Sequence, residues 1–354
     1  MKATIVLLSG DGIGPEVTAA AARVLEAVAK RGGHQISFKE HPIGGCSIEE
    51  YGVPLTNETL AACKSADAVL LGAVGGPKWD DPNAPVRPEQ GLLAIRKDLG
   101  LYANLRPVRS HPALLASSPL KAERLDGVDL IVVRELTGGL YFGQPKGRFV
   151  ENGRVRAVDT MAYEDYEIVR IIELAFRLSR SRKKKVTSVD KANILETSRL
   201  WRQTANEIAA KNPDIAIEHT LVDTASMRLI TSPASFDVIV TENMFGDILT
   251  DEASVLAGSM GMLPSASLGD NRPGLFEPIH GSAPDIAGKG IANPLGSILS
   301  AALLLRYGLH LEREAVAIEA AVDQAISAGM RTTDLGGELS TEEMTQAVLH
   351  RISL

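Results

Sequence analysis

The sequence predicts an α/β fold in which short buried strands alternate with amphipathic helices. The first strand is predicted at 4–8, where β-branched residues and leucines precede a glycine-rich turn and a proline that suits the start of a helix. Further apolar runs of strand length lie at 68–71, 130–133, 186–189, 215–220 and 236–240. Apolar residues recur at helical spacing at 166–179, 197–210, 297–307 and 314–326.

The composition is typical of a globular protein with room for two domains. The chain has 354 residues, of which 45% are apolar and 23% are charged. No apolar run approaches the roughly 20 residues that a membrane span needs. The net charge of −7 argues against a nucleic-acid partner, and the basic run at 177–185 is interpreted as the solvated end of a helix.

Two features of the chain favour a cytoplasmic location. Two cysteines, Cys46 and Cys63, cannot form a disulfide framework, so a reducing compartment is the simplest context. The short N-terminal apolar run passes directly into Gly10-Asp11-Gly12 without a cleavage pattern. We therefore expect this run to be a strand and not a targeting signal.

The first turn does not carry the common dinucleotide fingerprint. Its glycines follow the spacing G-x-G-x-G, whereas the fingerprint that places a pyrophosphate on a helix N-terminus is G-x-G-x-x-G. A tight strand-to-helix turn accounts for these glycines. A Rossmann fold is therefore not predicted.

Two aspartates four residues apart, Asp247 and Asp251, follow the strand predicted at 236–240. On a helix, residues i and i+4 lie on one face with their Cβ atoms roughly 5–6 Å apart. Two adjacent carboxylates suit a hard divalent cation such as Mg²⁺ or Mn²⁺. The alternative is that the acids only favour the first turn of a helix, where the helix dipole attracts negative charge.

Several charged and polar residues are expected where predicted elements end. Three of them are arginines, Arg96, Arg106 and Arg134. Each could be a solvated charge, but converging guanidinium groups would bind a di- or tricarboxylate by paired hydrogen bonds. Lys191 follows a predicted strand, and Tyr141 lies in the glycine-rich stretch 137–143, where backbone can approach a ligand closely.

Five motifs in one order resemble the family of β-decarboxylating hydroxyacid dehydrogenases, which includes isocitrate and isopropylmalate dehydrogenases. They are GDGIGPE at 10–16, NLRP at 104–107, DKAN at 190–193, ENMFGDILTD at 242–251 and HGSAPD at 280–285. The segment EQGLLAIR at 89–96 is similar to the isopropylmalate-oxidising branch. The resemblance spans nearly the whole chain.

The resemblance implies an isopropylmalate-dehydrogenase-like α/β fold, with two domains around a long mixed sheet. A discontinuous cofactor-binding domain would comprise 1–101 and 258–354, and 102–257 would bind substrate and metal and form the dimer. Homodimers with shared active sites are implied, in which Lys191 and Asp223 reach the site from the partner chain. Asp223, Asp247 and Asp251 would together bind one Mg²⁺ or Mn²⁺.

The activity implied is NAD-dependent oxidative decarboxylation of 3-isopropylmalate to 4-methyl-2-oxopentanoate and CO₂, in leucine biosynthesis. Lys191 would act as the general base and Tyr141 as the acid, although a salt bridge and ring packing are the ordinary roles of such residues. The substrate-binding set implied is Glu89, Leu92, Leu93, Arg96, Arg106, Arg134 and Asp223. The two leucines suit an isopropyl group, whereas isocitrate would need polar groups there.

The cofactor-binding set implied comprises Ile13, His280, Gly281, Ser282, Ala283, Asp285, Ile286 and Asn293. Asp285 can accept hydrogen bonds from both ribose hydroxyls and would repel a 2′-phosphate, which favours NAD over NADP. Its alternative role is to cap a turn after Pro284.

Three competing functions differ in what they require of the chain. A sibling enzyme would oxidise D-malate, tartrate, homoisocitrate or isocitrate with the same residues. A non-catalytic regulatory subunit would keep the fold without needing the catalytic set. A metal-nucleotide module such as a kinase would need a phosphate-binding loop of the Walker type, which the sequence lacks.

Overall fold

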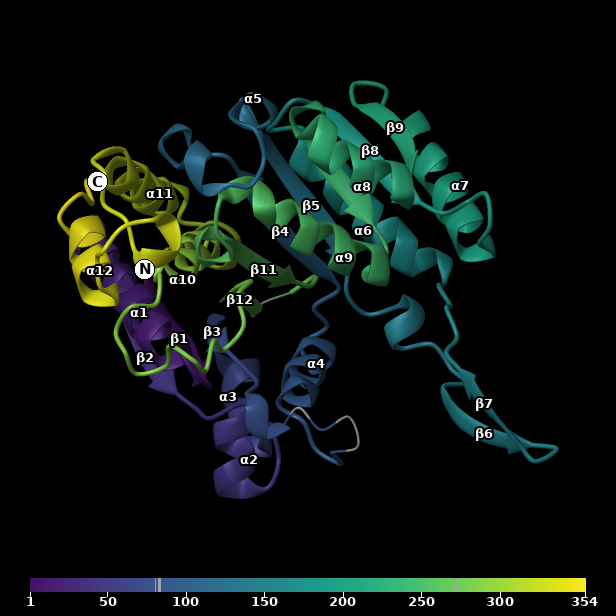
Figure 1. Cartoon of the computed structure of the whole chain (residues 1–354), viewed down its shortest axis with the longest axis horizontal. Helices are drawn as coiled ribbons and strands as arrows, with labels where there is room; N and C mark the ends of the chain where they lie inside the picture. Colours follow the sequence, from purple (N-terminus) through teal and green to yellow (C-terminus); the bar gives the residue numbers. More distant parts are fainter. Residues whose placement is uncertain (80, 82–83, 272) are drawn as a thin grey trace. The chain divides into compact units, whose positions relative to one another are not determined.

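The computed structural model describes residues 1–79, 81, 84–271 and 273–354. These residues form two compact units (Figure 1). Unit 1 comprises Met1–Leu101, His111–Pro119 and Ala257–Leu354, and unit 2 comprises Tyr102–Ser110 and Leu120–Leu256. The expected division at 101/102 and 257/258 differs from these units in the segment 111–119 and by one residue at Ala257, which belongs to unit 1. This segment packs with the terminal parts of the chain, because Leu114 is buried there and Arg331 donates a hydrogen bond to the Ala113 carbonyl.

Unit 1 is built on five strands in the spatial order β2-β1-β3-β12-β11. Their bounds are β1 Lys2–Gly10, β2 Gln35–Glu40, β3 Ala68–Ala73, β11 Pro264–Leu268 and β12 Gly274–Pro278. All pair in parallel except β11 with β12, which are antiparallel. The helices are α1 Gly14–Arg31, α2 Gly45–Tyr51, α3 Asn57–Ser65, α4 Pro88–Asp98, α10 Leu295–Leu303, α11 Glu312–Ser327 and α12 Thr341–Leu349.

The core of unit 1 follows from the apolar faces of these elements. Every residue of β3 is buried, as expected of a central strand of a parallel sheet that is covered on both faces. The buried face of α1 packs on α10, so the start and the end of the chain meet in one core. At about 25 cal/mol per Å² of apolar area, such burial is the main source of stability.

Unit 2 contains five strands in the order β4-β5-β10-β8-β9, of which only the pair β4 and β5 is antiparallel. Their bounds are β4 Ala103–Arg109, β5 Asp129–Glu135, β8 Lys185–Asp190, β9 Ala216–Leu221 and β10 Val238–Thr241. The helices are α5 Ala122–Leu125, α6 Asp165–Ser179, α7 Glu196–Ala210, α8 Val222–Thr231 and α9 Asn243–Ser254. Helix α6 packs on α7, and α8 packs on α9.

An antiparallel hairpin in unit 2 consists of β6 Gly147–Glu151 and β7 Arg154–Val158. Figure 1 shows this hairpin extending away from the helices of the unit. The Val150 and Val155 side chains, which pair across it, are 77% and 72% exposed. A two-stranded hairpin with apolar residues in water is only marginally stable on its own. We therefore expect this hairpin to pack against another protein surface.

The predicted α/β class is confirmed, and the structure adds elements that the sequence did not indicate. The helices expected at 166–179 and 197–210 are α6 and α7, each starting one residue earlier. The strands β2, β11 and β12 and the hairpin were not predicted. Within the described ranges, no helix is both long and apolar enough to span a membrane.

Candidate active site

Helix α9 starts at the end of β10 because Glu242 caps it. The Glu242 carboxylate accepts hydrogen bonds from the backbone N–H groups of Met244 and Phe245, at 3.1 and 2.7 Å. A side-chain cap of this kind stabilises a helix by about 1 kcal/mol. No acidic residue lies in the first turn of α9. Attraction to the helix dipole therefore does not explain Asp247 and Asp251, which lie further along.

Asp247 receives hydrogen bonds from two side chains. Arg134, at the end of β5, donates from Nη1 to Asp247 Oδ1 and forms an ion pair with it. The Tyr141 hydroxyl donates to Asp247 Oδ2 at 2.7 Å. The Asp247 side chain remains 39% exposed. Arg134 and Tyr141 each lie more than one hundred residues before Asp247 in the sequence, and the fold brings both side chains to its carboxylate.

Asp251 faces the second arginine of the predicted set. Arg106 Nη1 lies 3.3 Å from Asp251 Oδ1 and 2.7 Å from the Thr250 hydroxyl, and Nε donates to Asn104 at 2.9 Å. Arg106 lies within β4 and not at its end, contrary to expectation. The strand nevertheless directs the guanidinium to α9. The structure therefore brings Arg106, Arg134, Tyr141, Asp247 and Asp251 together.

Tyr141 is held as a neutral hydrogen-bond donor. Burial raises the pKa of its hydroxyl to about 12, and the hydrogen bond to Asp247 contributes to the rise. The residue ends a short 3₁₀ helix, Gly139–Tyr141, in which Gly139 has a φ of +74°. A Cβ atom on Gly139 would lie 2.6 Å from the Tyr163 hydroxyl, so only glycine fits there.

Lys191 and Asp223 form a pair of their own within the chain. Lys191 directly follows β8, Asp223 lies in the first turn of α8, and Lys191 Nζ is 2.5 Å from Asp223 Oδ1. The hydrogen bond from Lys191 lowers the pKa of the Asp223 carboxyl. Among the described residues, no group of three or more His, Cys, Asp or Glu side chains is placed to bind a metal ion. The predicted triad of aspartates is thus not assembled from one chain.

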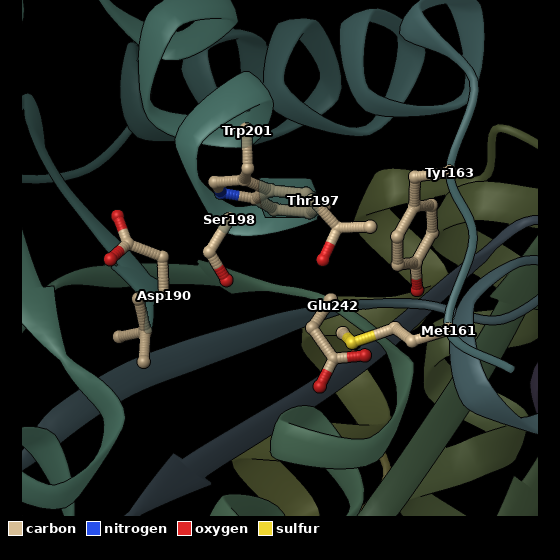
Figure 2. A pocket seen from close by; sticks show the side chains of 8 residues that line it. Met161, Tyr163, Asp190, Thr197, Ser198, Trp201 and Glu242 are labelled. Atoms are coloured by element: carbon tan, nitrogen blue, oxygen red, sulfur yellow. The ribbon is translucent and has the colours of Figure 1, made fainter. Parts of the chain in front are cut away.

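A small pocket lies between the end of β8, the start of α7 and Glu242, which caps α9 (Figure 2). Its lining consists of Met161, Tyr163, Val189, Asp190, Thr197, Ser198, Trp201 and Glu242. Asp190 forms a bidentate ion pair with Arg202, and the Ser198 hydroxyl accepts the Lys191 N–H at 3.0 Å. These polar groups are engaged with the protein, so the pocket supports the site and is not itself a binding site.

Four predicted substrate residues lie on α4 in unit 1. Arg96 Nη2 donates to Glu277 Oε1 at 2.7 Å, and both side chains are largely buried. Leu92 packs partly against the core of the unit, whereas Leu93 is 42% exposed. Adjacent helical residues point about 100° apart, so the two leucines do not form one flat apolar wall. The Glu89 carboxylate lies beside Gly75.

The predicted cofactor residues gather around the first turn of unit 1. Ile13 N–H donates to the Ser282 carbonyl at 2.8 Å, and a Cβ atom on Gly12 would lie 2.0 Å from that oxygen. The buried Ile13 packs with partly buried Ala283 and Ile286. The glycine turn therefore lets the loop at 280–286 lie directly on the start of α1.

Two side chains of this loop have groups available to a ligand. His280 Nδ1 donates to the Gly281 carbonyl at 2.9 Å, and Nε2 is buried without a hydrogen-bond partner in the described part of the chain. Burial lowers the pKa of His280, which favours the neutral ring. No described residue donates a hydrogen bond to the exposed Asp285 carboxylate, so a role as turn cap is not supported.

Asn293 is fixed by a residue that the sequence did not indicate. Its Nδ2 donates to Asp334 at 3.0 Å, and its Oδ1 accepts the Leu295 N–H. Asp334 also accepts hydrogen bonds from Ser259 and Thr332. Asp334 lies far from the loop in sequence, and no local pattern marks it.

The comparisons with known proteins show the class to which the chain belongs. The family model described as isocitrate/isopropylmalate dehydrogenase matches residues 4–348. The chain belongs to this family. The predicted resemblance is thus confirmed, as is the oxidoreductase class.

The most informative relatives are similar over their whole length. A 3-isopropylmalate dehydrogenase of Anaeromyxobacter dehalogenans is 70% identical, with 100% of each chain covered. One of Bacillus subtilis is 58% identical, covering 98% of this chain and 96% of the relative. A crystal structure of isocitrate dehydrogenase from Methylococcus capsulatus is 35% identical with a TM-score of 0.87, covering 99% of both chains. A β-decarboxylating dehydrogenase from Thermococcus kodakarensis is 39% identical with a TM-score of 0.81, covering 99% of this chain and 96% of that one.

Proposed function

We propose that the protein catalyses the NAD-dependent oxidative decarboxylation of 3-isopropylmalate to 4-methyl-2-oxopentanoate and CO₂, as a cytoplasmic step of leucine biosynthesis. The observation that carries this proposal is the convergence of Arg134 and Tyr141 on Asp247. It brings together a guanidinium group, a protonated hydroxyl and a carboxylate, which are the kinds of group that the reaction would need to bind a substrate carboxylate, to donate a proton and to bind a metal ion. Relatives that are 56–70% identical and named for this substrate support the choice of reaction.

The substrate carboxylates would be bound by guanidinium groups. Arg106 and Arg134 already hold carboxylates of α9 by hydrogen bonds, which is the geometry that a substrate carboxylate would use. Arg96 completes the proposed set, and its Nε is buried without a hydrogen-bond partner in the described part of the chain. Holding the substrate at several points fixes its reacting carbon and lowers the entropic part of the barrier.

The donor set on α9 fits a hard divalent cation in part. Asp247 and Asp251 supply carboxylates on one helix face, and both remain substantially exposed. Among the described residues of one chain no third acid joins them, so we assign that position to Asp223 of a second copy of the chain. Bound Mg²⁺ or Mn²⁺ would supply Lewis acidity at the oxygens of the substrate's hydroxyl and adjoining carboxylate.

The proton transfers would be performed by the chain's own residues. Lys191, in its neutral amine form and acting with Asp223, would accept the proton of the C2 hydroxyl. When the bond between the substrate carbon and the departing CO₂ has broken, Tyr141 would donate its hydroxyl proton to that carbon. A hydroxyl with a pKa of about 12 is protonated at neutral pH, as a general acid must be.

The residues around the first turn of unit 1 fit NAD. Nε2 of His280, which is buried and has no hydrogen-bond partner among the described residues, and the exposed carboxylate of Asp285 would be hydrogen-bond acceptors for the base and the ribose. The set proposed to hold the cofactor is Ile13, His280, Gly281, Ser282, Ala283, Asp285, Ile286 and Asn293. Bound NAD would accept the hydride that leaves C2 of the substrate.

We further propose that the protein is a homodimer with shared active sites. Unit 2 exposes apolar side chains on the β6–β7 hairpin and on α8 and α9, including Val150, Val155, Met227 and Ile248. Exposed apolar groups of this extent are typical of a protein interface. A second copy packed there would bury them and bring in its own Lys191 and Asp223.

A substrate panel followed by NADH absorbance tests the reaction. We expect turnover of 3-isopropylmalate well above that of D-malate, tartrate, homoisocitrate and isocitrate. Leu92 and Leu93 offer no charge for the third carboxylate of isocitrate and homoisocitrate, and D-malate and tartrate lack the isopropyl group that these apolar side chains suit. Higher turnover of a sibling substrate would overturn the substrate assignment. No NAD reduction on any substrate, with Mg²⁺ or Mn²⁺ present, would favour a non-catalytic subunit.

A further inference from the structure

Arg134 and Tyr141 reach Asp247 from two different segments, and one buried side chain contacts both. Asn243 is the first residue of α9 and is 1% exposed. Its Oδ1 accepts hydrogen bonds from Arg134 Nε at 3.2 Å and from Nη2 at 2.8 Å. Its Nδ2 donates to the Gly138 carbonyl at 3.1 Å. Gly138 precedes the short helix that ends in Tyr141.

We infer that Asn243 is a positioning residue that couples the Arg134 guanidinium to the turn that carries Tyr141. This inference rests on the roles proposed above for Arg134 and Tyr141. The amide of asparagine has an acceptor and a donor at one end, and here the two serve different segments. Aspartate could keep the contact with Arg134 but could not donate to the carbonyl. Alanine would lose both contacts.

The turn is also held from its opposite side. Glu135, which is fully buried, accepts the N–H groups of Thr137 and Gly138, both at 2.8 Å. The N–H of Gly138 is thus bound by Glu135 and its carbonyl by Asn243. The turn therefore has little freedom to shift unless one of these contacts is broken.

Tyr163 links these two contacts. Its hydroxyl donates to Glu135 Oε2 at 3.2 Å and accepts the Asn243 N–H at 3.0 Å. A Cβ atom on Gly138 would lie 2.5 Å from the Tyr163 ring, so the ring lies directly on the backbone of the turn. Figure 2 shows Tyr163 in the pocket beside Glu242, the residue that precedes Asn243. The start of α9 and the turn therefore share one buried support.

The experiment compares Asn243→Asp and Asn243→Ala with wild type in steady-state assays with 3-isopropylmalate, NAD and Mn²⁺. Misplacing a reacting group by about 1 Å can lower a rate about a hundredfold. We expect Asn243→Asp to keep the KM for 3-isopropylmalate within about threefold while kcat falls at least about tenfold. Asn243→Ala should lower kcat similarly and also raise this KM about tenfold.

Amide hydrogen exchange of 137–141 provides a readout that does not depend on turnover. Exchange should accelerate in both variants, because both lose the bond to the Gly138 carbonyl. Thr241→Val is the matched control. Thr241 is also fully buried, and its hydroxyl donates one hydrogen bond, to the Val189 carbonyl. Thr241 pairs with Arg134 in the sheet through the backbone, which the substitution leaves in place, and its hydroxyl bond goes to neither the Arg134 side chain nor the turn. The control should leave kcat, KM and exchange at 137–141 unchanged.

Parallel Arg134→Lys and Tyr141→Phe variants separate the inference from the proposed function. If both retain full activity, the proposed roles fail. If both lose activity while Asn243→Asp and Asn243→Ala behave like wild type, only the coupling fails. Identical KM and kcat changes in the two Asn243 variants would also overturn the coupling, because the two contacts would then not act separately.

Discussion

At the scale of single residues, Asp247 is the point where the proposed chemistry is concentrated. It accepts hydrogen bonds from Arg134 and Tyr141 and is still partly exposed. Its accessible oxygen surface is what a cation or a substrate group would use.

Asp247→Asn should therefore abolish turnover far more than it lowers stability. The amide keeps the shape and can still accept one hydrogen bond, but it lacks the charge that binds a divalent cation. We expect kcat to fall at least about a hundredfold, with only a small change in the urea midpoint. Glu173→Gln, at an exposed position of α6, is the control for removing one helical carboxylate. An unchanged rate at saturating Mn²⁺ would refute the assignment.

Tyr141→Phe tests the proposed acid through both rate and pH dependence. Loss of a general acid should lower kcat about a hundredfold or more. In wild type the folded-state pKa is raised, to about 12, above the unfolded value of about 10. The stability from the neutral hydroxyl is therefore complete below about pH 10 and is lost as pH rises towards 12.

Unfolding midpoints measured between pH 8 and 11.5 test whether stability falls with rising pH in this way. The stability of wild type should fall more steeply above about pH 10 than that of Tyr141→Phe, because only wild type has this titration. The partial exposure of Tyr141 makes the difference modest. Parallel curves for the two proteins would show that the Tyr141 hydroxyl is not held in its neutral form.

At the scale of elements, the β6–β7 hairpin is the segment whose role the single chain leaves open. Its ladder is regular, but its valines face water. A strand pair with unpaired edges and apolar side chains is a template for pairing with another chain.

Val150→Glu with Val155→Glu should weaken the proposed dimer. Charges on both valines would have to be buried in the interface, which is costly. We expect a shift towards monomer in sedimentation at micromolar concentration, together with loss of turnover, because Lys191 and Asp223 would no longer reach the partner's site. Val150→Thr with Val155→Thr is the control, since threonine keeps the strand preference and adds no charge. A monomer with full activity would contradict shared active sites.

At the scale of the whole molecule, the proposed metal site is completed only when two chains associate. Bound metal should therefore stabilise the assembly as well as permit turnover. Removing divalent ions with EDTA should abolish NAD reduction without unfolding the protein, and Mn²⁺ should restore the rate.

Added Mn²⁺ should also raise the melting temperature. Saturation at about a hundredfold above the dissociation constant would add about 2.7 kcal/mol. The same titration of Asp223→Asn should show a smaller rise, because one proposed ligand is removed. If EDTA leaves turnover intact, the protein does not depend on a divalent cation.

The sequence alone determined the α/β class, several elements and the family, because these depend on local patterns. Periodicity predicted α6 and α7 to within one residue at the start, since an apolar face repeats along the helix itself. The acid pair Asp247 and Asp251 was also predicted from a local pattern, because residues four apart lie on one face of a helix. Strands β11 and β12 were not predicted, because runs of five residues that contain proline and few β-branched residues carry little strand signal.

Only the tertiary structure decided which residues meet. Arg134 and Asp247 are separated by more than one hundred residues, and their ion pair depends on β5 lying next to β10. The sequence did not indicate the supporting roles of Asn243, Glu135 and Tyr163, although Asn243 lies within the motif at 242–251, because a buried polar side chain is recognised by its partners and not by its neighbours in sequence. The types and spacing of the candidate site residues can be read from the sequence. The buried residues that position these side chains come together only by packing between segments that are far apart in sequence.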